Sequence, residues 1–308
     1  MEHSIPITEA FPSDLLKIFE GLLHSYTTQP NAVKHTVDSL DDSSLARREY
    51  GFPAFILDRQ LARLLSDDSS AARSRLRMAA IAASCLSLPR RVAALRLPSE
   101  ILCHYPRALR IIADHLTTNS DAVYPTSSCD FFIKDVRTTL ALAVPCGAQY
   151  VDLRGAIRLR SLVKNAIFTR NMMPLWQLAR SAIFTPWYEI HTDPRDLIDF
   201  TEQGWESCYR NIAQLLTKNP VVAGMVGTSW FYDPQLLSIS PRIAYLQTTP
   251  LLGGALRIRN GPGAIHTERA TSKSVTRRKL YEEGKYLPVC YTIIWPRDPL
   301  LAWAHSQS

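Results

Sequence analysis

Three ionisable side chains, Glu189, His191 and Asp193, stand at alternate positions just before Pro194. Aromatic residues precede them, so the segment predicts a β-strand, in which alternate side chains point to the same face. A histidine beside two carboxylates can supply a general base together with a group that orients it. A solvated strand end, in which the histidine bonds its neighbours, explains the same residues, and the sequence leaves both interpretations open.

The spacing His191-x-Asp193 also has the form of the first half of an iron-binding facial triad. His266 supplies a distal histidine, and Arg277 could pair with a carboxylate co-substrate. The run from Gly253 to Ile258 resembles the segment before the distal histidine of phytanoyl-type oxygenases, and the resemblance implies Fe(II) and 2-oxoglutarate as cofactors. A helix predicted directly after the triplet opposes this interpretation, because the oxygenase fold continues with strands at that point.

Cationic side chains are frequent in the last quarter of the chain, where a loop is expected to enter a helix. Such a segment suits the phosphates of coenzyme A, a nucleotide or a phosphopantetheine carrier. A solvated basic helix face explains the same residues. The side chains concerned are Arg257, Arg259, Arg269, Lys273, Arg277, Arg278 and Lys279.

An aromatic run, Trp230, Phe231 and Tyr232, follows a strand expected at 221–226 and ends at Asp233. Aromatic side chains at a strand end can line an apolar substrate pocket, with Tyr232 or Asp233 as the polar group in it. Packing in the core explains the run equally well.

The segment from Arg278 to Tyr286 resembles the Leu-Tyr-Glu-x-x-Gly-Phe element near the C-terminus of acyl-CoA-dependent N-acyltransferases. The segment 222–227 is similar to the central strand against which the acyl thioester lies in that family. The resemblance implies that Tyr281 protonates the departing thiolate. The family's glycine-rich pyrophosphate loop has no counterpart between Gly227 and Ser240, so the expected donor is either acyl-CoA or the thioester of an acyl carrier.

These residues together predict an acyltransferase-like enzyme that moves an acyl group from a thioester donor to an amine-bearing small molecule and needs no metal. Glu189 or His191 deprotonates the amine, Tyr281 acts as the acid, and Arg257, Arg259, Arg277 and Arg278 hold the anionic donor. The first alternative is an Fe(II)/2-oxoglutarate-dependent oxygenase that uses His191, Asp193, His266 and Arg277. The second alternative is a binding module without catalysis.

The elements that position these groups follow from hydrophobic periodicity. Apolar residues recur at helical spacing from Phe11 to about Leu116, and the period then changes. Strands are expected at 131–133, 140–144, 150–153, 187–191, 221–226, 255–258 and 289–295. Helices between them are expected at 175–183, 201–216, after the cap Ser240-Pro241, and at 272–283, where Gly284 closes the helix.

This order predicts an α/β (α+β) protein, in which a mostly helical region, 1–120, packs on a mixed-sheet domain, 121–308. The polar cluster between Thr117 and Thr126 marks the expected boundary.

Composition narrows the choice of partners. Lys and Arg outnumber Asp and Glu, 35 to 28, which favours anionic small molecules. The arginines are scattered, so nucleic acid is not favoured as a partner. The six cysteines form no Cys-x-x-Cys pair, and no signal peptide or membrane span is expected, which favours a soluble cytoplasmic protein. Motifs for serine hydrolases, dinucleotide binding and P-loops are absent from the sequence.

Overall fold

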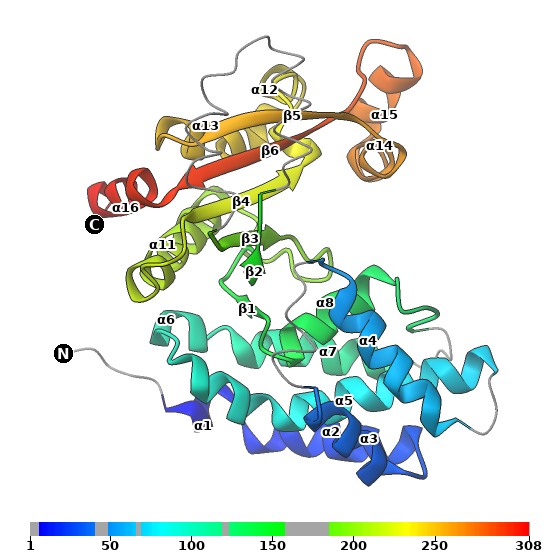
Figure 1. Ribbon diagram of the computed structural model, residues 1–308. Coiled ribbons are helices and arrows are strands. Elements are labelled where there is room, and N and C mark those ends of the chain that lie inside the picture. Colours follow the sequence, from blue (N-terminus) through cyan, green and yellow to red (C-terminus); the bar gives the residue numbers. More distant parts are fainter. Residues whose placement is uncertain (1–5, 41–48, 66–68, 119–122, 158–184, 308) are drawn as a thin grey trace. The chain divides into compact units, whose positions relative to one another are not determined.

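The computed structural model describes residues 6–40, 49–65, 69–118, 123–157 and 185–307. Its N-terminal half is helical, and its C-terminal part contains a six-stranded mixed sheet with interspersed helices (Figure 1), which confirms the predicted α+β class. The chain forms two compact units. Unit 1 comprises Met1–Asp152 and Asp193–Leu197, and unit 2 comprises Leu153–Thr192 and Ile198–Ser308. The helix predicted at 175–183 lies outside the described residues.

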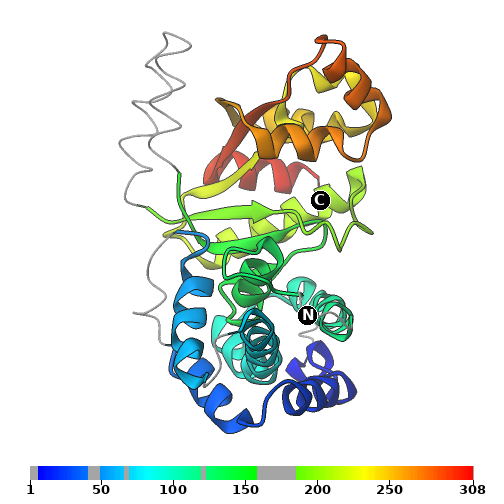
Figure 2. The same ribbon diagram turned by 90° about the vertical axis from the view of Figure 1, so that its right-hand side faces the viewer.

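The long helix α5, Ser70–Leu95, is the centre of unit 1. The Ser69 hydroxyl accepts a hydrogen bond from the Ala72 amide, which caps the start of the helix. Helices α2, α3 and α8 pack against α5, and Figures 1 and 2 show the blue α2 beside it. The unit 1 helices are α1 (Ile7–Ala10), α2 (Ser13–Tyr26), α3 (Pro30–Asp38), α4 (Phe52–Leu61), η1 (Ala62–Leu64), α5, α6 (Ser99–Leu102), α7 (Tyr105–Thr117) and α8 (Asp130–Thr139).

Helix α5 is also the one described helix that is long and apolar enough to cross a membrane, by length and composition alone. Of its most apolar window, 56% is buried inside the protein. Buried core helices of soluble proteins share this length and composition, so the helix favours neither a membrane location nor its absence.

Helix α8 corrects one prediction, because the apolar run at 131–133 is helical and not a strand. Phe132 and Val136 are both buried, and their spacing of four residues matches one face of a helix. Lys134 and Asp130 add an ion pair of 2.7 Å at the same spacing. Three consecutive apolar residues are typical of a strand, but in this helix only Phe132 of the three is fully buried.

The sheet has the strand order β1-β2-β3-β4-β6-β5. Strands β3 and β4 are parallel and are connected through helix α11, Glu202–Lys218, whereas β1/β2, β4/β6 and β5/β6 are antiparallel. The strands are β1 (Ala143–Pro145), β2 (Tyr150–Gly155), β3 (Trp187–His191), β4 (Gly224–Ser229), β5 (Leu256–Pro262) and β6 (Val289–Pro296). The strand predicted at 140–144 is therefore shorter and later, because Ala141 turns the chain with φ 57°.

Both faces of the sheet in unit 2 carry apolar residues. On one face, Trp187, Val226, Ile258 and Ile294 form a core cluster. On the other face, the Trp295 ring of β6 meets Tyr209 of α11 and Trp303 of α16, Arg297–Ser306, at 5.2 Å in each case. Strands β4 and β6, which lie in the interior of the sheet, are therefore covered by apolar side chains on both faces.

The remaining helices of unit 2 connect β4 to β5 and β5 to β6. They are η2 (Trp230–Tyr232), α12 (Leu236–Ile239), η3 (Pro241–Ile243), α13 (Tyr245–Leu252), α14 (Ala264–Thr271) and α15 (Val275–Glu282). Two starts differ from the prediction: Ser274 caps α15 through the Arg277 amide, and the Ser240 side chain forms no cap. Gly284 closes α15 as predicted, with φ 68°.

Candidate functional site

One edge of the sheet collects most of the predicted site residues. Strands β3, β4 and β5 end there, at His191, Ser229 and Pro262, and β6 begins there at Val289 because it is antiparallel to β4 and β5. We call this edge the carboxyl edge. Ligands of open sheets bind where parallel strands end, so this edge is the first place to look for a site.

A row of polar side chains crosses the sheet close to the carboxyl edge. The hydroxyls of Thr228 and Thr292 lie 2.8 Å apart, and the Asn260 amide nitrogen donates to the Thr292 hydroxyl at 2.8 Å. His191 extends the row, because β3 and β4 are in register at Ile190 and Gly227, one residue earlier in each strand. Glu189 pairs with Val226 on the same face. Strands β4, β6 and β5 therefore each contribute a polar side chain to the row that begins at the predicted site residue His191.

The sequence assigns no role to Thr228, which directly precedes the predicted aromatic run, and does not point to Thr292 or Asn260. Thr292 lies at an alternate position of a strand that the sequence predicts. Knowledge of which strands pair would therefore have revealed the row. The carbonyl oxygen of the Asn260 side chain is buried and has no hydrogen-bond partner among the described residues. It is an acceptor that a ligand could satisfy.

Asp193, the third member of the predicted triplet, belongs to unit 1. There, Arg195 donates to both Asp193 oxygens, at 3.1 Å from Nε and 2.7 Å from Nη2. The same guanidinium binds Asp135 through both Nη atoms, at 2.9 and 2.6 Å. Burial acts to raise the pKa of Asp193, but the bonds from Arg195 outweigh it and hold the pKa below its usual range. The Asp193 carboxylate thus serves a buried ion-pair network.

The aromatic run after β4 is a packed element. Phe231 meets Trp230 and Tyr232 edge to face, with centroids 5.2 and 5.3 Å apart, and Tyr232 is fully buried. Asp233 is also buried, and its carboxylate accepts hydrogen bonds from the amides of Val289 at 3.0 Å and Gln235 at 3.1 Å. Burial raises the pKa of Asp233, while the two amide bonds act in the opposite direction. Tyr232 and Asp233 are therefore buried residues whose packing and hydrogen bonds determine the structure of the carboxyl edge.

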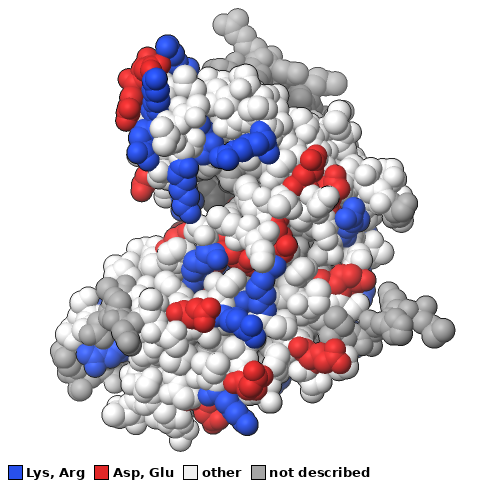
Figure 3. Space-filling model, turned by 180° about the vertical axis from the view of Figure 1, so that it is seen from behind, with Lys and Arg blue, Asp and Glu red and all other residues white. Residues whose placement is uncertain are grey.

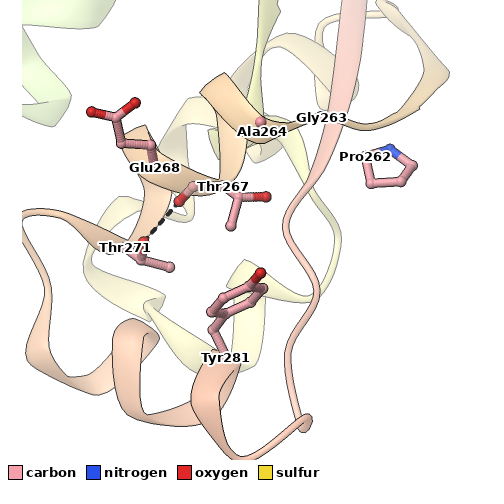
Figure 4. A pocket seen from close by; sticks show the side chains of 7 residues that line it. All are labelled: Pro262, Gly263, Ala264, Thr267, Glu268, Thr271 and Tyr281. Carbon is pink, nitrogen blue, oxygen red and sulfur yellow. Dashed lines mark hydrogen bonds between the residues drawn. The ribbon is translucent and has the colours of Figure 1, made fainter.

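Beyond the end of β5 lies a pocket of about 540 Å³. Figure 4 shows the Tyr281 ring of α15 directed at the pocket side of α14, with the Glu268 carboxylate pointing away from it. The Thr271 hydroxyl is held by the Thr267 carbonyl at 2.8 Å. The pocket is lined by Pro262, Gly263, Ala264, Thr267, Glu268, Thr271 and Tyr281. Of these, the sequence predicts only Tyr281, because α14, which carries most of the others, lies where the sequence predicts a loop.

The predicted cationic residues occupy two places. On β5, Arg257 donates to the Gln247 side chain at 2.9 Å and lies over the Tyr291 ring, and Arg259 also bonds Tyr291. On α15, Arg277 is buried, and Arg278 is exposed and donates to the Ser272 carbonyl. Figure 3 shows Lys and Arg side chains, mixed with Asp and Glu, gathered at the upper left, over α14 and α15. Much of the basic segment is therefore a solvated helix surface.

His266, the predicted distal iron ligand, lies on α14 outside the residues that line the pocket. Burial lowers its pKa, and the nearby charge of Arg269 lowers it further. Among the described residues there is no group of three or more His, Cys, Asp and Glu side chains placed to hold a metal ion.

Comparison of the chain with protein-family models, with curated proteins and with solved structures finds no match. Its function is therefore inferred from the residues and their geometry.

Proposed function

We propose that unit 2 is an acyltransferase that moves an acyl group from a thioester donor to an amine. The observation that carries the proposal is the place of Tyr281. Its phenol is 42% exposed and faces the pocket of about 540 Å³ where β5 ends. A tyrosine hydroxyl is one of the polar groups that orient ligands in such pockets. This is the residue that the resemblance to N-acyltransferases assigns as the acid.

The reaction needs a base and an acid. The amine nitrogen attacks the thioester carbonyl carbon, water takes the amine proton, and a C–N bond forms; neither Glu189 nor His191, the bases expected from the sequence, lines the pocket that Tyr281 faces. The C–S bond then breaks, and the Tyr281 phenol gives its proton to the departing sulfur. The products are an amide and a free thiol, and the phenolate regains a proton from solvent.

The arrangement of β4 supports this proposal. Strand β4 is the strand that the resemblance matches to the support of the acyl thioester, and it lies in the interior of the sheet between β3 and β6. It continues to Ser229, beyond Gly227, the last residue of β4 that pairs with β3. An extended donor can therefore pair with backbone groups of Thr228 and Ser229 where the two parallel strands stop pairing.

Donor binding is the first test, by isothermal titration of the full chain with acetyl-CoA, octanoyl-CoA and S-octanoyl pantetheine. We expect saturable binding of at least one thioester, and we expect Ala264→Phe to abolish it because the new ring fills the pocket. Ile265→Phe is the matched control: it places the same ring one position along α14, at an exposed residue outside the pocket lining.

Two results would contradict the proposal. One is that none of the three thioesters binds; the other is that Ala264→Phe and Ile265→Phe bind the donor equally well. Anaerobic titration with Fe(II) and 2-oxoglutarate provides a further check. A visible charge-transfer band that disappears in His191→Ala and His266→Ala would replace acyl transfer by oxygenase chemistry.

A further inference from the structure

Arg277 is a buried cation that forms no ion pair with any acid among the described residues. Its side chain is 5% exposed. Its Nε donates to the Ala270 carbonyl at 2.6 Å, and its Nη1 donates to the Ser240 hydroxyl at 3.1 Å. Both acceptors are neutral. Within the described part of the chain, Arg277 forms no ion pair, and Nη2 has no acceptor.

The residues around Arg277 do not compensate its positive charge. The guanidinium carbon lies 4.7 Å from the centroid of the Trp230 ring, which orients the guanidinium plane. A second cation, Arg242, is exposed on η3, two residues after Ser240, whose hydroxyl accepts the hydrogen bond from Arg277. Burial lowers the pKa of Arg277, Arg242 lowers it further, and Tyr286 acts in the opposite direction.

A second polar group, on Tyr286, is unsatisfied close to α15 in the chain. The phenol oxygen of Tyr286 is buried and has no hydrogen-bond partner among the described residues. An unpaired buried charge and an unpaired buried hydroxyl each cost free energy, and a bound anion would supply acceptors for both.

We propose that Nη2 of Arg277 and the guanidinium of Arg242 bind an oxyanion, the phosphate or carboxylate group of a ligand, beside Trp230. Arginine suits this role because its remaining donor is held in a fixed direction by the two bonds that the other nitrogens make. The site stands on these contacts alone, and it would remain if acyl transfer were disproved.

The site has a defined relation to the pocket. Arg277 and Tyr281 are four residues apart on α15, so their side chains leave the same face of the helix one turn apart. Arg277 contacts Ala270 of α14, and Tyr281 faces Thr267 of the same helix. A ligand whose anionic group binds Arg277 can therefore extend along α14 into the pocket.

The test is isothermal titration of the full chain with inorganic phosphate and, separately, with acetate, at constant ionic strength. We expect saturable binding of one of the two anions. Arg242→Gln should weaken it about tenfold, since one charged contact is lost. Arg277→Lys, which keeps the charge but loses the fixed donor, should abolish saturation. Lys279→Gln is the matched control: it removes one exposed charge on the opposite side of α15 and should change affinity less than about twofold.

Tighter binding of phosphate identifies a phosphorylated ligand, and tighter binding of acetate identifies a carboxylate ligand. If neither anion binds saturably, the proposal is wrong. It is also wrong if Arg242→Gln binds as tightly as Lys279→Gln. Because Arg242 is exposed, its variant tests the site even if Arg277→Lys fails to fold.

Discussion

The carboxylate of Asp233 accepts a hydrogen bond of 3.0 Å from the backbone amide of Val289, the first residue of β6. The contact joins the end of the aromatic run after β4 to the start of the strand that pairs with β4. It fixes the distance between the two segments that border the carboxyl edge. The Gln247 amide nitrogen adds a second link, donating to the Asp233 carbonyl at 2.8 Å.

Replacing Asp233 by alanine should therefore destabilise unit 2 strongly. The change leaves the buried Val289 amide without an acceptor, so we expect a loss of about 2–3 kcal/mol in the free energy of unfolding. Asp233→Asn keeps one acceptor oxygen and should lose less. Urea titration followed by tryptophan fluorescence measures both variants, and equal midpoints for wild type and Asp233→Ala would show that the contact contributes nothing.

The ion pairs of Arg195 should contribute more to the free energy of unfolding than any surface ion pair in unit 1. Asp135 and Asp193 are buried, with 2% and 3% of their side chains exposed, so removing the guanidinium leaves two unpaired buried carboxylates. We expect Arg195→Ala to lower the free energy of unfolding by about 3–5 kcal/mol. Arg90→Ala breaks the exposed pair with Asp38 and should cost less than about 1 kcal/mol. Similar losses in the two variants would contradict this reading.

The same ion-pair network predicts that the stability of the protein depends on pH. The pKa of Asp193 is lower in the folded than in the unfolded protein, so its contribution is present above the unfolded pKa and is lost as the pH falls through the folded pKa. Urea midpoints measured from pH 6 downwards should therefore fall less steeply in Asp193→Asn than in wild type. Asp14→Asn, at an exposed residue of α2, should retain the wild-type slope. Parallel curves for wild type and Asp193→Asn would contradict the prediction.

Two glycines should respond to alanine with opposite signs. A Cβ at Gly227 in β4 would lie 2.7 Å from Ile190 Cγ1 and 2.9 Å from the Tyr232 hydroxyl, so Gly227→Ala should cost about 1–3 kcal/mol. A Cβ at Gly21 in α2 meets nothing within 4 Å, and Gly21→Ala should stabilise the helix by about 0.5–1 kcal/mol. Thermal unfolding measures both changes, and stabilisation by Gly227→Ala would show that β4 has more room than the contacts indicate.

The sequence predicts the helices and strands better than it predicts which of them lie side by side. The apolar pattern is sufficient to locate β3, α11 and β6: α11 has apolar residues at helical spacing, and β3 and β6 are short runs with buried residues on both faces. They are not sufficient for α8, where Phe131, Phe132 and Ile133 are consecutive although only one of them is fully buried. Helix α14 was missed because its small and polar residues carry almost no apolar periodicity.

The candidate site shows the same limit. Tyr281 and His191 were found from local patterns, because a motif or an alternation in the chain marks them. The row that joins Thr228, Thr292 and Asn260 depends on the order of three strands, and no local pattern records which strands are adjacent. Asp193 illustrates the opposite error: it follows the alternation of β3, but its partner Arg195 places it in unit 1.

The most direct test of acyl transfer is the rate of thiol release from octanoyl-CoA, measured with a thiol reagent in the presence of a panel of amines that includes spermidine and lysine. At saturating donor, Tyr281→Phe should reduce the rate by about 100-fold or more and leave the donor KM unchanged, because only the proton donor is lost. Glu282→Gln, the adjacent exposed residue, should retain the wild-type rate. An equal rate in wild type and Tyr281→Phe would contradict the role of Tyr281, and with it the proposed function.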